Sequence, residues 1–191
     1  MKNIFKLLAI AFVAGGMMVA CGDNNNGDDP DDPTPEPEPV AAWAANFDGA
    51  SIDISALAAA SCGYQSSQDG TQYYLWNFQA ASKVEGNTVY FPYLVNYMQG
   101  ESASEFAVAD LELFKDTYYE LSGYPYGDWQ YYSTNSVNCS KMDLTKHMLS
   151  YTLNATMWSL TDMANGVESQ DDCTQKPLAL TVSNMTYEAS K

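Results

Sequence analysis

The segment from Met148 to Trp158, MLSYTLNATMW, alternates apolar and polar side chains along its length. Apolar residues occupy every second position from Leu149 to Met157, and Ser, Thr or Asn fills each position between them. Because successive side chains of a β-strand point to opposite faces of the sheet, this period of two predicts a long strand with one buried and one hydrated face. The backbone of such a strand needs partners, so the domain that contains it requires a sheet.

Three further segments carry the same period: residues 72–78 (QYYLWNF), 89–97 (VYFPYLVNY) and 177–188 (PLALTVSNMTYE). In the last of these the apolar positions slip in phase after Val182, as a β-bulge near Ser183 would produce. Pro92 lacks a backbone donor, which indicates an edge strand or a bulge in the segment around it. The strands at 148–158 and 177–188 are expected to form a hairpin around the long loop 161–176.

Two segments fit either a helix or a strand. Residues 51–61, SIDISALAAAS, are rich in alanine, and residues 102–114 begin with a capping box formed by Ser102 and Glu105. The later part of 102–114 alternates again, so we interpret it as a strand. All 14 tyrosines and all four tryptophans follow residue 40, and these residues favour sheets. We therefore predict an all-β domain at 41–191, an antiparallel β-sandwich or small β-barrel of about seven strands.

The first 21 residues have the features of an export signal. Lys2 and Lys6 precede an apolar run from Leu7 to Ala20, which is too short to cross a bilayer but fits a secretory signal peptide at 1–20. The run ends Met18-Val19-Ala20-Cys21, which resembles the lipobox of bacterial lipoproteins. That resemblance implies cleavage before Cys21, a diacylglyceryl thioether on its sulfur, and attachment of the mature chain to a membrane.

Residues 21–40 are expected to form a tether that carries the lipid on Cys21. The sequence GDNNNGDD, residues 22–29, resembles the acidic export signal of surface-exposed lipoproteins of Bacteroidetes, which implies the outer membrane, facing the exterior. Five prolines between Pro30 and Pro39 impose extended geometry, so the tether would hold the domain roughly 60 Å from the membrane at about 3.1 Å per residue. The downstream order of Gly63-Tyr64, a polar turn, an aromatic strand and two long final strands also resembles small lipoproteins of this group, and implies fold and location only.

The charge of the chain excludes one class of partner. Its formal net charge is −16, and the domain carries 17 acidic residues against six lysines and no arginine. Nucleic acids are bound through Lys and Arg that neutralise phosphates, so an acidic chain without arginine is not expected to bind them.

Catalytic and metal-binding motifs are sparse. The single histidine, His147, precedes the strand at 148–158 without a G-x-S-x-G elbow, and the cysteines show no C-x-x-C spacing, so neither a catalytic triad nor a zinc site is predicted. The glycines form no phosphate-binding loop, and no cofactor is expected. A carboxylate-pair hydrolase stays open, because it needs only two suitably spaced acids. The acidic loop from Glu168 to Asp172 fits a solvated loop better than a divalent-cation site.

The domain has three cysteines, Cys62, Cys139 and Cys173. An exported protein retains disulfides, and three cysteines cannot all pair internally. Cys139 and Cys173 both fall outside the long predicted strands, so they are the preferred pair, which leaves Cys62 as a buried thiol; three reduced cysteines are the alternative.

Aromatic residues gather between Tyr118 and Ser133, in YYELSGYPYGDWQYYS. Exposed Tyr and Trp rings provide rigid contact area for sugars or proteins, so Tyr124, Tyr126, Trp129 and Tyr131 form a candidate ligand platform. Packing of the same rings in a core or hairpin is the competing interpretation. We expect a lipid-anchored envelope protein that acts by binding rather than catalysis, with an envelope protein or a glycan as its ligand.

Overall fold

The computed structural model describes residues 41–66, 70, 72–115, 120–121, 124–125 and 127–189, and side chains are described outside 116–126. These residues belong to one compact unit, Glu38–Lys191. The predicted signal peptide, Cys21 and the whole predicted tether at 21–40 lie outside the described residues.

The described part of the chain is almost entirely β-structure, which confirms the predicted all-β class. Seven strands have eight residues or more: β3 (Ala56–Ser66), β4 (Gln72–Glu85), β5 (Thr88–Gly100), β6 (Ala107–Phe114), β9 (Trp129–Asp143), β10 (Met148–Ser159) and β11 (Gln175–Thr186). Five shorter strands accompany them: β1 (Ala42–Phe47), β2 (Ala50–Ile52), β7 (Glu120–Leu121), β8 (Tyr124–Pro125) and β12 (Glu188–Ala189). The helices are α1 (Leu160–Ala164) and a 3-10 turn, Gln170–Asp172.

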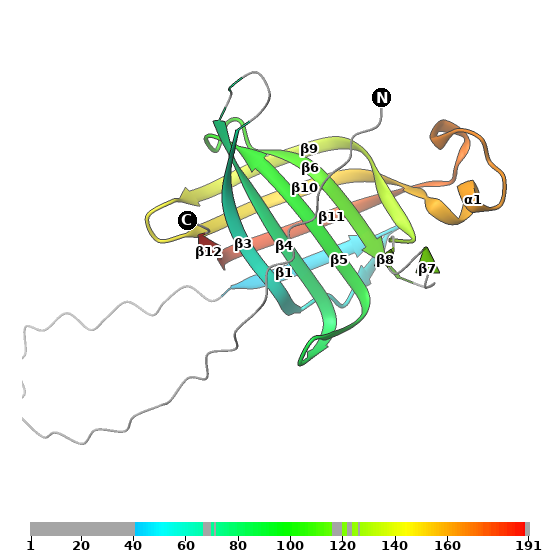
Figure 1. The fold of residues 1–191 in the computed structure, drawn as a ribbon, viewed down its shortest axis with the longest axis horizontal. Helices are drawn as coiled ribbons and strands as arrows, with labels where there is room; N and C mark the ends of the chain where they lie inside the picture. The colour runs from blue at the N-terminus through cyan, green and yellow to red at the C-terminus, as the bar shows by residue number, and fades with distance from the viewer. Residues whose placement is uncertain are drawn as a thin grey trace, which may run out of the picture. The chain divides into compact units, whose positions relative to one another are not determined.

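Ten strands form a single sheet in the order β12-β3-β4-β5-β6-β9-β10-β11-β1-β2, and β7 pairs with β8 separately. All long neighbours are antiparallel, whereas β12 runs parallel to β3. Only Tyr187 separates β11 from β12, so the end of β11 reaches β3 on the other side of the fold. Figure 1 shows β3, β4 and β5 crossing in front of β10, β11 and β1. The sheet is thus continuous, and its two halves face each other.

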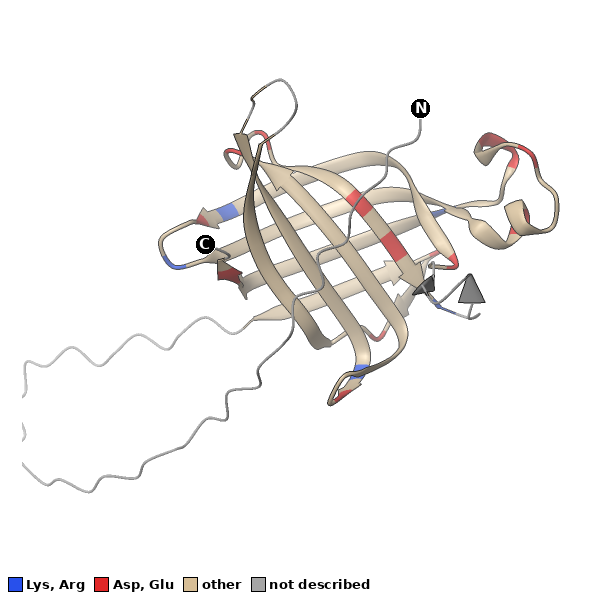
Figure 2. Ribbon diagram, in the orientation of Figure 1, with Lys and Arg blue, Asp and Glu red and all other residues tan. Residues whose placement is uncertain are grey.

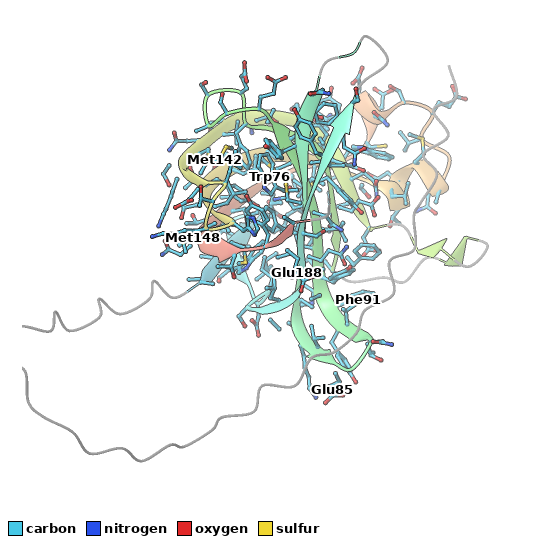
Figure 3. All side chains as sticks on the ribbon, turned by 60° about the vertical axis from the view of Figure 1, so that its left-hand side comes forward. Trp76, Glu85, Phe91, Met142, Met148 and Glu188 are labelled. Carbon is cyan, nitrogen blue, oxygen red and sulfur yellow. The ribbon has the colours of Figure 1, made fainter. Side chains whose placement is uncertain are left out.

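The core lies between these two halves. The front half contributes large buried side chains such as Trp76, Phe78 and Leu94, and the back half contributes Tyr151 and Met157. Figure 3 shows Trp76 within the dense interior and Glu85 at the tip of the β4–β5 hairpin. Burial of apolar area on this scale is the main contribution to the stability of such a domain.

The predicted hairpin at the C-terminal end is confirmed. Every apolar residue of the alternating set from Leu149 to Met157 is buried in β10, and its partner strand is β11. The register slips between the Leu149–Met185 and Tyr151–Val182 pairs, so the bulge falls where the sequence predicted it. Asn184 adopts a positive φ of 48° within this bulge.

Strand β5 lies between β4 and β6, but its pairing with β6 begins only at Tyr93, so Pro92 lies where β5 has a partner on one side, and the bulge alternative is confirmed. The register of β4 against β5 shifts between Ala81–Tyr93 and Lys83–Tyr90, opposite Pro92. The core-facing residues of β5 are Leu94, Asn96 and Met98. The aromatic set of the sequence pattern therefore lies on the outer face.

Both ambiguous segments are resolved as strands. Residues 51–61 enter β2 and β3. The capping box closes a tight turn rather than a helix, since the Ser102 hydroxyl donates to Glu105 Oε2 at 3.2 Å before β6 begins.

Candidate functional site

An open cleft of about 340 Å³ lies where β9 begins and where β10 passes into α1. Its lining combines one indole ring, hydroxyl groups, carboxylates and one ammonium group, from Asp128, Trp129, Ser159, Thr161, Asp162, Thr174 and Lys176. The volume lies at the lower end of the range for small-ligand sites, and polar side chains outnumber the single aromatic ring.

The wall at Asp128 is fixed by main-chain contacts. The Lys115 backbone N–H donates to Asp128 Oδ2 at 2.8 Å, and the Leu160 N–H donates to the Asp128 carbonyl at 2.9 Å. Asp128 is 4% exposed, which is rare for a carboxylate and requires such partners. The first of these bonds joins the residue that follows β6 to the residue that precedes β9.

A second part of the cleft lining is built on the first turn of α1. Ser159 caps the helix, and its Oγ accepts from the Asp162 N–H at 3.3 Å. Asp162 Oδ2 in turn accepts from the Thr174 N–H at 2.7 Å. Hydrogen bonds from the Thr174 side chain and backbone hold the pKa of Asp162 below its ordinary value, so this carboxyl group is ionised at neutral pH.

Trp129 is held between two neighbours. Its ring centroid lies 4.9 Å from that of Phe47, with an interplanar angle of 63°, and Lys176 Nζ lies 5.4 Å from the indole centroid. Lys176 also forms an ion pair with Asp48 at 2.6 Å. The cation–π contact and the ion pair together fix the ammonium group beside the cleft.

Of the four residues of the predicted aromatic platform, the structure describes the side chains of two, Trp129 and Tyr131. Trp129 and Tyr131 are half-buried and pack against the core, and the Tyr131 hydroxyl is 2.8 Å from Thr134 Oγ1. Both rings therefore contribute to core packing, and Trp129 also lines the cleft. Tyr124 belongs to β8, but its side chain lies outside the described ones, and Tyr126 lies outside the described residues.

The predicted Cys139–Cys173 disulfide is wrong, because both residues are thiols. Cys139 lies within β9 opposite Tyr151, whereas Cys173 precedes Thr174, whose carbonyl accepts from the Ser159 N–H. Tyr151 and Ser159 are eight residues apart on β10, or about 26 Å along the strand, whereas a disulfide needs Cα atoms within about 7 Å. The sequence was misread because Cys139 was assigned to a loop. Cys62 is buried, as expected.

His147 occupies an exposed turn with a φ of 50°, and its ring stacks on Tyr187 at 5.5 Å. Among the described residues, no group of three or more His, Cys, Asp or Glu side chains is placed to hold a metal ion.

No described helix is long and apolar enough to cross a membrane. No protein-family profile, curated protein or solved structure matches this chain.

Sequence reasoning singled out Trp129 but missed the rest of the cleft. Ser159, Thr174 and Lys176 come from the ends of β10 and β11, where a strand pattern carries no information about a cavity. One local signal was present: Ser159 stands three residues before Asp162, the spacing of a helix cap.

Proposed function

We propose that this chain is a lipid-anchored lipoprotein of the bacterial outer membrane, exposed at the cell surface, and that its β domain is a non-catalytic binding module. The cleft beside Trp129 carries the binding part of the proposal. It brings an indole, three hydroxyl groups, two carboxylates and an ammonium group to one concave site, which suits a small polar ligand.

Binding fits the lining of the cleft better than catalysis does. Asp128 and Asp162 each accept a hydrogen bond from a backbone N–H, and Ser159 Oγ accepts one as a helix cap. Groups committed in this way are rigid recognition elements. Asp162 is a poor proton donor, because the hydrogen bonds to its carboxylate hold its pKa below the ordinary value.

The anchor is tested at Cys21. The Cys21→Ala variant has no thiol for the lipid, so it should lose membrane association or accumulate as the uncleaved precursor. Cell fractionation and the mass of the processed N-terminus measure this, and protease treatment of intact cells measures surface exposure. A variant that is cleaved and membrane-bound like the wild type would overturn the anchor.

The cleft is tested with a variant that fills it. Thr161 lines the cleft and is only half-buried, so Thr161→Phe should block the cleft with little effect on the fold. Equilibrium dialysis of the full lipidated chain in detergent against a mixture of culture-medium solutes, followed by mass spectrometry, should show solutes enriched by the wild type and not by the variant. Leu144→Phe, at an exposed turn distant in sequence from the cleft, is the matched control. An identical set for both proteins would contradict the proposal.

A carboxylate-pair hydrolase is the second candidate, because Asp128 and Asp162 line the same cleft. A glycosidase of this kind needs one carboxyl group to be protonated, and the lowered pKa of Asp162 opposes that role. Release of reducing sugar from polysaccharides by the wild type, abolished in both Asp128→Asn and Asp162→Asn, would establish the hydrolase and overturn the non-catalytic assignment.

A further inference from the structure

We propose that the outer face of β4, β5 and β6 binds a neutral polysaccharide. This polar face is defined by six side chains: Asn77, Gln79, Tyr93, Tyr97, Asp110 and Glu112. The inference rests on the proposed function only in that the domain acts by binding outside the cell. It concerns a surface separate from the Trp129 cleft.

The six residues share one face because their neighbours in sequence are buried on the other. Trp76 and Phe78 on β4, and Leu111 and Leu113 on β6, all point into the core. Since alternate residues of a strand point in opposite directions, the positions between and beside them point outward.

The strand register aligns these side chains in rows across the sheet. One row runs from Asn77 through Tyr97 to Asp110. The next row runs from Gln79 through Val95 to Glu112, and it continues to Gln130 on β9. Neighbouring strands are about 4.8 Å apart and successive rows about 7 Å apart, so amide, phenol and carboxylate groups recur at these spacings across the three strands.

Hydrogen bonds hold part of this face in a fixed arrangement. The Tyr93 hydroxyl donates to Gln79 Oε1 at 2.6 Å, and Gln79 Nε2 donates to Asn77 Oδ1 at 3.1 Å. Each amide nitrogen has two N–H groups, so this chain leaves donors on Asn77 and Gln79 for a ligand. Burial raises the pKa of Tyr93 to about 12, which keeps its phenol neutral, so that its single O–H donates to Gln79 and its oxygen can still accept.

Glu112 is a constrained acceptor at the edge of the face. Its Oε2 accepts from the Gly127 N–H at 3.2 Å. A Cβ at position 127 would lie 3.0 Å from Glu112 Cβ and 3.1 Å from the Leu113 backbone, so a side chain there would require these neighbours to shift. Partial burial raises the pKa of Glu112, which means that its carboxylate is poorly hydrated and gains from an added donor.

The charge of the face selects the class of ligand. Figure 2 shows two acidic bands on β6 and no basic residue among the central parts of β3 to β6; Lys83 lies at the hairpin end. Among the described residues, neither Asp110 nor Glu112 forms an ion pair, and two such carboxylates repel polyanions and acidic proteins. Neutral sugars offer hydroxyl donors to carboxylates, accept from side-chain amides, and present C–H surfaces to tyrosine rings.

Affinity gel electrophoresis of the full lipidated chain in detergent tests this inference. The probes are three neutral polysaccharides (a galactomannan, a xyloglucan and soluble starch), with polygalacturonate as the acidic comparison. We expect at least one neutral polysaccharide to retard the wild type and polygalacturonate to have no effect. Tyr97→Ala and Asp110→Asn should each weaken the retarding interaction at least tenfold, and Tyr97→Phe should keep part of it.

Asp162→Asn is the matched control, because it removes one charge from the cleft and leaves the polar face intact. Thermal unfolding of each variant separates lost binding from lost folding, and Tyr97→Phe keeps the ring should Tyr97→Ala fail to fold. If none of the three neutral polysaccharides retards the wild type, the inference is overturned, whereas the proposal for the cleft is unaffected. The inference is also overturned if Asp162→Asn abolishes the retardation while the Tyr97 and Asp110 variants retain it. That result would assign the glycan to the cleft.

Discussion

The side-chain amide of Asn96 donates a hydrogen bond to the phenol oxygen of Tyr151 over 2.8 Å in the centre of the core. The two residues come from facing halves of the sheet, on β5 and β10, and their exposures are 0% and 1%. Among the described residues, Asn96 Oδ1 has no hydrogen-bond partner. One polar bond thus joins the two halves, at the cost of a buried carbonyl oxygen without a partner.

Removing one partner of this bond should cost more than removing both. Tyr151→Phe leaves the Asn96 amide buried without an acceptor, so we expect a loss of about 1–3 kcal/mol in the free energy of unfolding. The double variant Asn96→Leu/Tyr151→Phe removes every polar atom of the pair and should be more stable than the sum of the single changes predicts. Urea unfolding of the four proteins gives the coupling energy. Additive single effects would show that the bond contributes no net stability.

Cys62 should make the domain sensitive to alkaline pH. Burial raises the pKa of the Cys62 thiol from 9.0 to about 12. Its contribution is fully present below pH 9 and is lost as pH rises towards 12, with a slope of up to about 1.4 kcal/mol per pH unit. Cys62→Ala lacks this titration, so the wild type should lose stability faster than the variant over that range. Parallel pH dependences of the two proteins would contradict the assignment.

The cysteines of the β domain should be alkylated without prior reduction. Cys139 and Cys173 are thiols. Cys139 lies beside Tyr151 of β10 and Cys173 lies near Ser159 at the end of β10, which is too far for a disulfide bond. Iodoacetamide added to protein unfolded in urea without reductant should modify both, as judged by peptide mass spectrometry. A Cys139–Cys173 cross-linked peptide would contradict the structure. Cys139→Ser, which cannot form the bond, is the control for its detection.

Gly100 should be intolerant of any side chain. A Cβ at this position would lie 2.9 Å from the Glu105 carbonyl oxygen and 3.1 Å from the Phe106 Cα, which are backbone atoms of the β5–β6 turn. Gly100→Ala forces the turn apart and should cost roughly 1–3 kcal/mol. Ser104→Ala, an exposed change in the same turn, should have a much smaller effect. Thermal unfolding compares them, and an unchanged Gly100→Ala would show that the turn relaxes freely.

Much of the secondary structure could be predicted because alternation is a local property. The core face of β10 and the bulge in β11 follow from the sequence alone, since one buried face imposes a period of two and a bulge shifts its phase. The same reasoning failed at Cys139, where a continuous strand carries polar residues on a half-exposed face and was taken for a loop.

The candidate sites depended on contacts that no local pattern encodes. Alternation identified β5 but did not say that Asn96 would face the core while Tyr93 and Tyr97 face outward. Trp129 was recognised as an aromatic residue near a turn, yet its neighbours Phe47 and Lys176 come from opposite ends of the domain.

By itself, the sequence determined the all-β class of the domain and gave the grounds for expecting export and a lipid on Cys21, because periodicity and signal motifs are read within a few neighbouring residues. Only the tertiary structure decided which residues form the cleft and the polar face. Both surfaces arise from strand register and from the folding of one sheet over itself, which bring together side chains far apart in the chain.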